Sequence, residues 1–260
     1  MYDVSTTLIA AILLASMVVS IAVGHRFGRR AGPSTDVASK DHINAIQGSI
    51  LGILALLLGF TFSLSLQRYD SRSEAVVDEA NAIGTAYLRA QMLPAALRVD
   101  VDALLRAYVD VRVEAASVTL VDRAQREALV TKAADLQAAL WAQARRAAAL
   151  DPNPVTTGLY IQALNDVIDS FGRRDAALNR HVPEVVLWLV YAAFLMAGAI
   201  VGYACGIAGH RPSAVTYGMV VLIVVLVFII LDLDRPRRGL IQVSQKSLLD
   251  LQASIRAVRP

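Results

Sequence analysis

Four stretches of the sequence are apolar and long enough to cross a lipid bilayer as helices. They are residues 7–24, 46–66, 184–208 and 213–231. A helix rises 1.5 Å per residue, so a hydrocarbon core of about 30 Å needs about 20 apolar residues. In lipid each backbone N–H and C=O group must find its partner within the protein, which favours helices. The sequence therefore predicts an all-α integral membrane protein with four transmembrane helices.

The composition supports this class. Apolar residues make up 56% of the chain and charged residues 18%, whereas a soluble domain carries about a quarter charged residues. The net charge is +3, and no block of lysines or arginines points to nucleic acid. Abundant alanine, valine and arginine resemble a bacterial chain, so we expect the bacterial cytoplasmic (inner) membrane and its lipid bilayer as the surroundings.

The region between the second and third spans, residues 67–182, is charged, alanine-rich and periodic. Apolar residues recur there at spacings of three and four, which is typical of amphipathic helices. The second span continues without a helix breaker to Pro94, and only residues 151–158 resemble a firm loop. We therefore predict an antiparallel four-helix bundle that extends from spans 2 and 3. The three seams are Leu97, Val101, Leu104, Tyr108 and Val111; Leu129, Ala133, Leu136 and Leu140; and Ile161, Leu164, Ile168 and Phe171.

This organisation predicts four segments. Residues 1–66 hold spans 1 and 2 with a short basic connection, and residues 67–182 form a bundle domain outside the bilayer. Residues 183–234 hold spans 3 and 4, and residues 235–260 form an amphipathic C-terminal tail. Leu248, Leu251, Ile255 and Val258 give the tail an apolar stripe that suits either the membrane surface or the bundle.

Basic residues near the spans predict the orientation. No basic residue precedes the first span, so we expect an uncleaved anchor rather than a signal peptide. The positive-inside rule then places the first connection in the cytoplasm, and the bundle and both termini outside it. Arginines of the tail argue for the opposite orientation. The basic residues of the connection are Arg26, Arg29, Arg30 and Lys40, and those of the tail are Arg235, Arg237 and Arg238.

Small residues recur along two spans at spacings that allow close helix contact. Gly198, Gly202 and Gly206 follow one another at four-residue intervals in span 3, with Gly209 beyond them. Span 2 carries Gly48, Gly52, Ala55, Gly59 and Ser63 on a similar stripe, with Thr61 and Ser65 near its exit. We favour helix packing, within one chain or between chains. A pore lining in which Thr61 and Ser65 contact ions is the alternative.

The fourth span ends in the charged stretch LDLDRPRRG. Pro236 disfavours helix at Arg235, so we expect the helix to end near Asp234, and Gly239 to act as a joint. One interpretation is a helix stop with local pairing of acids and arginines. The other is a charged ring, in which Asp232, Asp234 and Arg235 of several subunits contact ions at a pore mouth.

Other chemistry finds little support. Glu74, Asp78 and Asn81, together with Asn165, Asp166 and Asp169, form a candidate cation patch if their helices touch, although a solvated face is the simpler interpretation. Four scattered histidines lack metal-ligand spacing, and no phosphate loop or nucleophile elbow is present. We therefore expect no enzyme, no bound metal and no cofactor. No ionisable residue lies in the middle of a span, which argues against a proton pump.

The stretches LDLDRPRRGLIQVSQKSLLDL and LLLGFTFSLSLQRYDSRSEAVVDEANAIGTAYLR, with the layout of two spans, a helical insertion and two spans, resemble the bacterial bestrophin-like domain family. The resemblance covers nearly the whole chain and implies a four-span membrane protein related to pentameric anion channels. The acidic calcium clasp and aromatic pore neck of true bestrophins have no counterpart in this sequence, and the bestrophin helical domain is cytosolic, opposite to our placement.

Two functions remain. The resemblance favours an ion channel, a homo-oligomer that conducts inorganic ions, with anions as the candidate species, through a pore between small-residue faces. The alternative is a membrane-anchored sensor or scaffold whose helical bundle binds a partner or a ligand.

Overall fold

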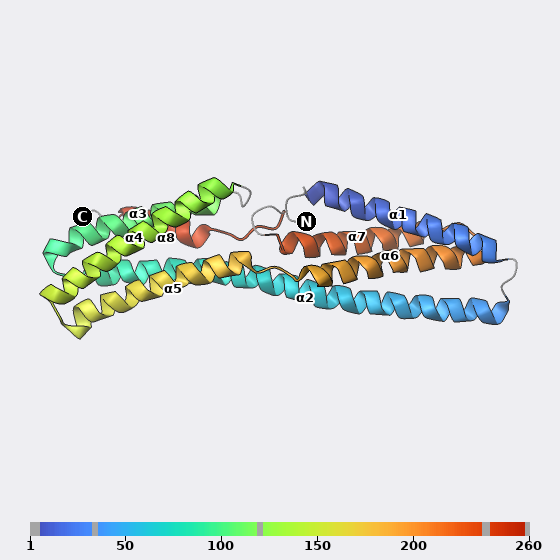
Figure 1. Ribbon diagram of the computed structural model, residues 1–260, viewed down its shortest axis with the longest axis horizontal. Helices are drawn as coiled ribbons and strands as arrows, with labels where there is room; N and C mark the ends of the chain where they lie inside the picture. The colour runs from blue at the N-terminus through green and yellow to red at the C-terminus, as the bar shows by residue number, and fades with distance from the viewer. Residues whose placement is uncertain (1–5, 33–35, 119–121, 236–239, 258–260) are drawn as a thin grey trace. The chain divides into compact units, whose positions relative to one another are not determined.

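The computed structural model describes residues 6–32, 36–118, 122–235 and 240–257, and they are helical apart from short connections (Figure 1). No strand occurs among these residues, and four helices are long and apolar enough to cross a membrane. The all-α class and the four spans are thus confirmed. The helices are α1 Thr6–Ala31, α2 Val37–Ala90, α3 Ala95–Ser117, α4 Arg123–Leu150, α5 Leu159–Asn179, α6 Glu184–Ile207, α7 Ala214–Leu233 and α8 Lys246–Ala257.

The helix boundaries follow local chemistry. α2 continues for 54 residues and ends before Pro94, the residue that precedes α3. Pro183 precedes α6, whose first turn carries Glu184, an acid at the positive end of the helix dipole. The prediction of a loop over residues 151–158 is wrong for residues 154–158, because Pro154–Gly158 form a turn of π-helix. The Asn153 carbonyl oxygen accepts a bond of 3.1 Å from the Gly158 amide and so closes this wider turn.

The chain divides into two compact units. The first, called the membrane unit, contains the described residues up to Arg68, His181–Arg235, and Leu240 and Ile241. The second, called the bundle unit, contains Tyr69–Arg180 and the described residues from Gln242 onward. Helix α2 contributes residues to both units.

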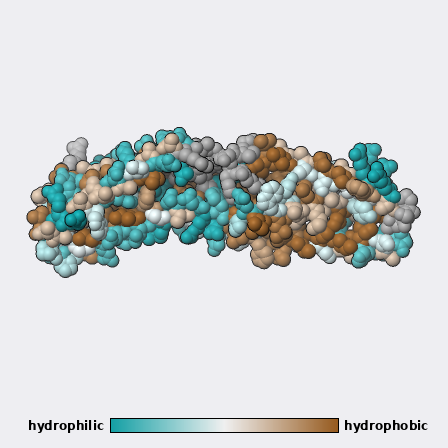
Figure 2. Space-filling model, in the orientation of Figure 1, coloured by the Kyte–Doolittle hydropathy of each residue, from teal (hydrophilic) through white to brown (hydrophobic). Residues whose placement is uncertain are grey.

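The membrane unit is built from α1, the first part of α2, α6 and α7. Its apolar cluster includes Met17 of α1, Leu54 and Leu58 of α2, Phe194 of α6 and Val227 of α7. Many other large apolar side chains of these helices are exposed, as expected for surfaces that face lipid. Figure 2 shows hydrophobic residues gathered over this unit, whereas the bundle unit presents a mostly hydrophilic surface.

A tight connection joins α6 to α7. Gly209 has a φ of +76°, which L-residues with a side chain rarely adopt. The His210 amide donates to the Cys205 carbonyl oxygen at 3.2 Å, and the Gly209 amide donates to that of Gly206 at 3.2 Å. This is the Schellman pattern that satisfies the last carbonyls of a helix. Gly209 therefore ends α6.

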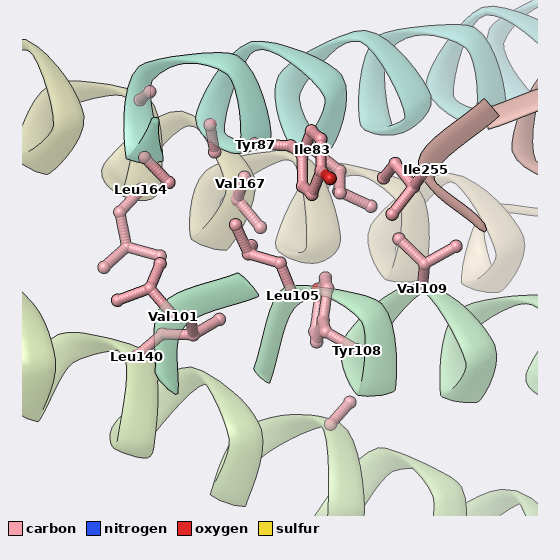
Figure 3. Close-up of a cluster of buried hydrophobic side chains, with 14 of the residues drawn as sticks. Ile83, Tyr87, Val101, Leu105, Tyr108, Val109, Leu140, Leu164, Val167 and Ile255 are labelled. Atoms are coloured by element: carbon pink, nitrogen blue, oxygen red, sulfur yellow. The ribbon is translucent and has the colours of Figure 1, made fainter. Parts of the chain in front are cut away.

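The bundle unit surrounds one apolar cluster with residues of α2, α3, α4, α5 and α8 (Figure 3). Ile83, Leu105, Leu140 and Leu164 are fully or almost fully buried within it. All residues of the three predicted seams belong to this cluster or pack against it.

The C-terminal helix α8 packs on the bundle unit. Leu248 and Ile255 are buried in its cluster, and Leu251 is partly buried against it. Of the two sites that the stripe allowed, α8 thus occupies the bundle rather than the membrane surface. Val258, the last residue of the stripe, lies outside the described residues, as do Pro236 and Gly239.

Candidate functional site

The glycines of α6 form a close backbone contact with α1. A Cβ atom added at Gly202 would collide with the backbone of Ile21, and one added at Gly206 would collide with that of His25. The contact is reciprocal, since a Cβ atom at Gly24 or Gly28 of α1 would collide with the backbone of α6. The Ser20 hydroxyl also donates to the Leu195 carbonyl oxygen at 2.6 Å. The contact partner of α6 is therefore α1 of the same chain, and the two glycines of α1 escaped the sequence analysis.

Beside this seam, Gly198 approaches side chains instead of backbone. A Cβ atom there would collide with the Met17 sulfur and would lie 3.4 Å from the Ser20 hydroxyl oxygen. Met17 is a long, flexible side chain that adapts to irregular gaps. Gly198 therefore lies at the more tolerant end of the α1–α6 seam.

The corresponding stripe of α2 has no such partner among the described residues. A Cβ atom added at Gly48, Gly52 or Gly59 would meet no described atom within 4 Å. Ala55 and Ser63 on the same stripe are exposed as well. We call this surface of Gly48, Gly52, Ala55, Gly59 and Ser63 the open face of α2. It is a flat strip of small residues that another helix can approach closely.

Thr61 and Ser65 lie on a different face of α2, in register with the buried Leu54 and Leu58. The Thr61 side chain is 2% exposed, and its hydroxyl donates to the Leu57 carbonyl oxygen at 2.6 Å. Ser65 is fully buried, and its hydroxyl has no hydrogen-bond partner within the part of the chain that the structure describes. Within one protomer both hydroxyls are turned toward the interior of the membrane unit, away from the open face.

Asp232 connects the end of α7 to residues 240–241 of the following segment. Its side chain is 1% exposed, and its two carboxylate oxygens accept bonds from the Leu240 amide at 3.1 Å and the Ile241 amide at 2.9 Å. A carboxylate that accepts two backbone amides is held in one position and is well compensated for its burial. In the protomer Asp232 therefore fixes the chain at the exit of α7.

Asp234 makes a similar connection to the entry of α6. Its carboxylate accepts a bond of 2.9 Å from the Val182 amide, and the ring of His181 lies 3.7 Å from the other carboxylate oxygen. His181 also lies 3.1 Å from the Asp234 carbonyl oxygen. Arg235, 4% exposed, is buried beside them. These residues tie residues 181–182, just before α6, to the end of α7.

The acidic patch is solvated. Glu74, Asp78 and Asn81 on α2 and Asn165, Asp166 and Asp169 on α5 are all exposed. Across the described ranges, no group of three histidine, cysteine, aspartate or glutamate side chains is arranged to hold a metal ion. The buried acid of this region is instead Glu79, one residue after Asp78.

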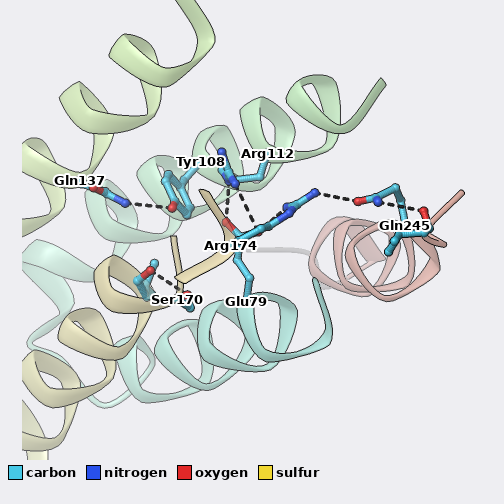
Figure 4. A network of polar contacts seen from close by, with 9 residues as sticks. Glu79, Tyr108, Arg112, Gln137, Ser170, Arg174 and Gln245 are labelled. Atoms are coloured by element: carbon cyan, nitrogen blue, oxygen red, sulfur yellow. Dashed lines mark hydrogen bonds and ion pairs between the residues drawn. The ribbon is translucent and has the colours of Figure 1, made fainter. Parts of the chain in front are cut away.

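Glu79 is the centre of a buried polar network in the bundle unit (Figure 4). Its carboxylate accepts a bond of 2.6 Å from Arg112 Nε and also pairs with Arg174 Nη1. Glu79 is 0% exposed, Arg112 6% and Arg174 2%. Arg174 Nη2 donates to the Gln245 side-chain oxygen at 2.7 Å, which connects the network to the segment before α8. Two guanidinium groups thus share one carboxylate.

Neighbouring aromatic residues complete the surroundings of the network. The Arg112 guanidinium carbon lies 4.6 Å from the centre of the Phe171 ring, in a cation–π arrangement. The Tyr108 hydroxyl accepts a bond of 3.0 Å from the Gln137 side-chain nitrogen. Burial, reinforced by the charge of Glu79, raises the pKa of Tyr108 to about 12. Tyr108 therefore remains a neutral phenol at physiological pH.

Sequence reasoning missed these charged residues, although the sequence contains a signal for them. Arg72, Val76, Glu79 and Ile83 follow one another at spacings of four, three and four, so two charged residues occupy positions of a buried seam. A charged residue at such a position is buried only when it is paired. That pattern would have distinguished Glu79 from the exposed Glu74 and Asp78.

Comparison with known proteins identifies the family. No match was found among curated proteins. A crystal structure of a bacterial bestrophin homolog from Klebsiella pneumoniae, carrying a point mutation, matches with a TM-score of 0.63 at 14% identity, over 95% of this chain and 98% of that one. That likeness supports the fold. The model of the bestrophin-like domain family matches residues 10–248. This match spans most of the sequence, and the chain therefore belongs to the bestrophin-like domain family.

Proposed function

We propose that this multi-pass membrane protein is one subunit of an oligomeric ion channel. The observation that carries the proposal is the open face of α2, a strip of small residues that the described chain leaves uncovered. Lipid gives helices no hydrophobic reason to associate, so surfaces that allow close backbone packing are where membrane helices meet. The open face provides such a contact for α2 of a neighbouring subunit, or the wall of a pore between subunits.

Anion conduction is the finer part of the proposal. Its support is the family, because the solved relative is described as a bestrophin homolog and the resemblance seen in the sequence implies a relation to anion channels. Each span lacks an ionisable residue at its middle, which suits passive conduction better than ion-coupled transport. The placement of the bundle and both termini outside the cytoplasm remains a prediction based on the basic residues of the first connection.

For Asp232 and Asp234 the proposal assigns a positioning role rather than direct contact with ions. Within the protomer the Asp232 carboxylate accepts two backbone amides and the Asp234 carboxylate accepts one. An Asp232→Asn side chain keeps one acceptor and turns an N–H group toward an amide N–H, which costs about 1–3 kcal/mol locally. We expect D232N to loosen residues 240–241 without changing the ion preference of the open pore. A changed ion preference would support the charged-ring hypothesis instead.

The first test is the oligomeric state of the full chain in nanodiscs, measured by native mass spectrometry. A closed ring of four or five subunits is the expected result, followed by anion-selective currents in planar bilayers. A monomer or a dimer leaves no space for a pore between subunits and contradicts the proposal. The sensor or scaffold function, with the bundle unit as its binding domain, would then take its place.

A further inference from the structure

We propose that the bundle unit binds a small organic monocarboxylate in a cavity lined in part by the C-terminal segment. This inference is independent of channel function. The cavity has a volume of about 160 Å³. Its polar lining includes the side chains of Arg72, Arg174 and Gln245, and its apolar lining includes Val76, Leu178 and Val243. Guanidinium groups on one part of the wall and aliphatic side chains on another match a carboxylate attached to a short hydrocarbon chain.

The charge of the buried network favours an anion. Arg112 and Arg174 share the single carboxylate of Glu79, so these three side chains carry one net positive charge. They are at most 6% exposed, where water screens charge weakly. A bound carboxylate would balance that charge and accept charge-assisted hydrogen bonds from guanidinium N–H groups.

Arg174 is placed to make this contact. It lines the cavity and has five N–H donors in a planar fork. Its described bonds engage Nη1 with Glu79 and Nη2 with Gln245. These two bonds fix the orientation of the guanidinium group. A rigid, desolvated arginine loses little entropy when it binds, which is the condition for recognising a small ligand.

Arg72 gives the same cavity a second guanidinium group in a fixed place. Its Nε donates to the Ala177 carbonyl oxygen at 3.2 Å and its Nη2 to that of Arg180 at 2.8 Å. A cation beside the last carbonyls of α5 is also favoured by the helix dipole. At 2% exposure Arg72 is buried to the same extent as Arg174.

The size of the cavity limits the ligand. A cavity of about 150 Å³ lined by apolar side chains holds a molecule of six carbon atoms, as in an engineered lysozyme. The present volume therefore suits propionate or butyrate. Val76, Leu178 and Val243 would cover the hydrocarbon part.

The C-terminal segment forms one wall. Gln242, Val243 and Gln245 line the cavity, and α8 follows directly at Lys246. The Gln245 side-chain nitrogen donates to the Val243 carbonyl oxygen at 3.0 Å while its oxygen accepts from Arg174. A ligand in the cavity would add contacts between this segment and the rest of the bundle unit. Binding is therefore expected to stabilise the docking of α8.

The test uses the full chain in nanodiscs, in buffer without organic acids. Propionate and butyrate are titrated while the melting temperature and the hydrogen exchange of residues 246–257 are followed. We expect a saturable rise of the melting temperature and at least a fivefold slowing of exchange in α8. The matched neutral ligand, propionamide, should produce neither. Equal effects of propionate and propionamide, or no effect of either, would overturn the proposal.

Two further experiments test which features of the ligand and of the cavity determine binding. Chloride and sulfate are titrated in the same way, at constant ionic strength. If either binds as tightly as propionate, the aliphatic wall takes no part and the monocarboxylate assignment is wrong.

Ala116→Leu, which fills the cavity without touching its charges, should weaken propionate binding at least tenfold. Ala138→Leu on the exposed face of α4 is its matched control. Unchanged binding in A116L, or equal weakening in A138L, would also contradict the site.

Discussion

At Glu79 the bundle unit holds one carboxylate between the guanidinium groups of Arg112 and Arg174. Removing the charge of Glu79 leaves two buried cations without their anion. Breaking a buried ion pair from one side costs about 3–5 kcal/mol. We therefore expect Glu79→Gln to lower the free energy of unfolding of the bundle unit by that amount, measured by denaturant titration of the full chain in nanodiscs.

The matched control is Glu74→Gln, the same substitution on an exposed position of the same helix. Surface substitutions of this kind change stability by no more than about 0.5 kcal/mol. Similar losses in E79Q and E74Q would mean that burial of Glu79 does not determine its contribution.

Tyr108 gives the bundle unit a pH dependence at the alkaline end. Burial raises its pKa to about 12, whereas an unfolded tyrosine titrates near its ordinary value of about 10. The folded state thus binds more protons between these values, and stability falls as pH rises from about 10 to about 12. Two pH units correspond to roughly 2–3 kcal/mol. The melting temperature of the wild type should fall across this window.

Tyr108→Phe removes the titrating group and is the control for this effect. It also removes the bond from Gln137, which costs about 1 kcal/mol at neutral pH. We expect the variant to have a lower melting temperature than the wild type at pH 8. Between pH 10 and pH 12, however, its melting temperature should fall by less than that of the wild type. Parallel curves for the two proteins would assign the alkaline loss to other groups.

Single residues show where sequence reasoning stops. Asp232 was visible as a charge at the end of a span, but its two bonds to Leu240 and Ile241 depend on how the chain turns after α7. Glu79 looks no different from Asp78 by composition, and only its register with Val76 and Ile83 marks it as buried. The residue types show which side chains are charged. Which of these side chains are buried depends on tertiary packing.

At the scale of elements, the glycines of α1 and α6 make one joint. A side chain at Gly202 has no space, because its Cβ atom would already collide with the Ile21 backbone, which does not move as a flexible side chain would. We expect Gly202→Leu to separate α1 from α6 and to cost more than the 1–3 kcal/mol that is typical of overpacking. Loss of folded protein after detergent extraction and a lower melting temperature are the readouts.

Gly218→Leu is a suitable control within the same unit. Gly218 lies in α7, also a candidate span, and a Cβ atom there would meet no described atom within 4 Å. If G218L loses as much stability as G202L, helix flexibility or insertion explains the loss, and the close contact does not.

Elements were the scale at which the sequence was most informative. Hydrophobic length predicted four spans, and Pro94 marked a helix boundary because proline lacks the amide that a continuing helix needs. Which helices pair was harder to predict. A glycine ladder on α6 predicts a close neighbour without naming it, and the neighbour proved to be α1. The surface on which α8 docks was equally hard to predict, because one apolar stripe can pack against lipid or against protein.

For the whole molecule, the open face of α2 connects the protomer to the proposed assembly. Small residues on an uncovered strip leave a membrane helix free to pack against another copy. The channel proposal therefore predicts that large side chains on the open face of α2 change the oligomeric state without unfolding the protomer. Thr61 and Ser65, buried on another face, should not respond in this way.

Gly52→Leu combined with Gly59→Leu tests this prediction. Both positions have open space in the protomer, so the melting temperature should change by no more than a few degrees while native mass spectrometry shows smaller assemblies. Val221→Ala and Leu222→Ala, at exposed positions of α7, control for changes in the contact with lipid. An unchanged ring in G52L/G59L, with unchanged currents, would mean that the open face of α2 contacts lipid and that the subunits meet through another surface.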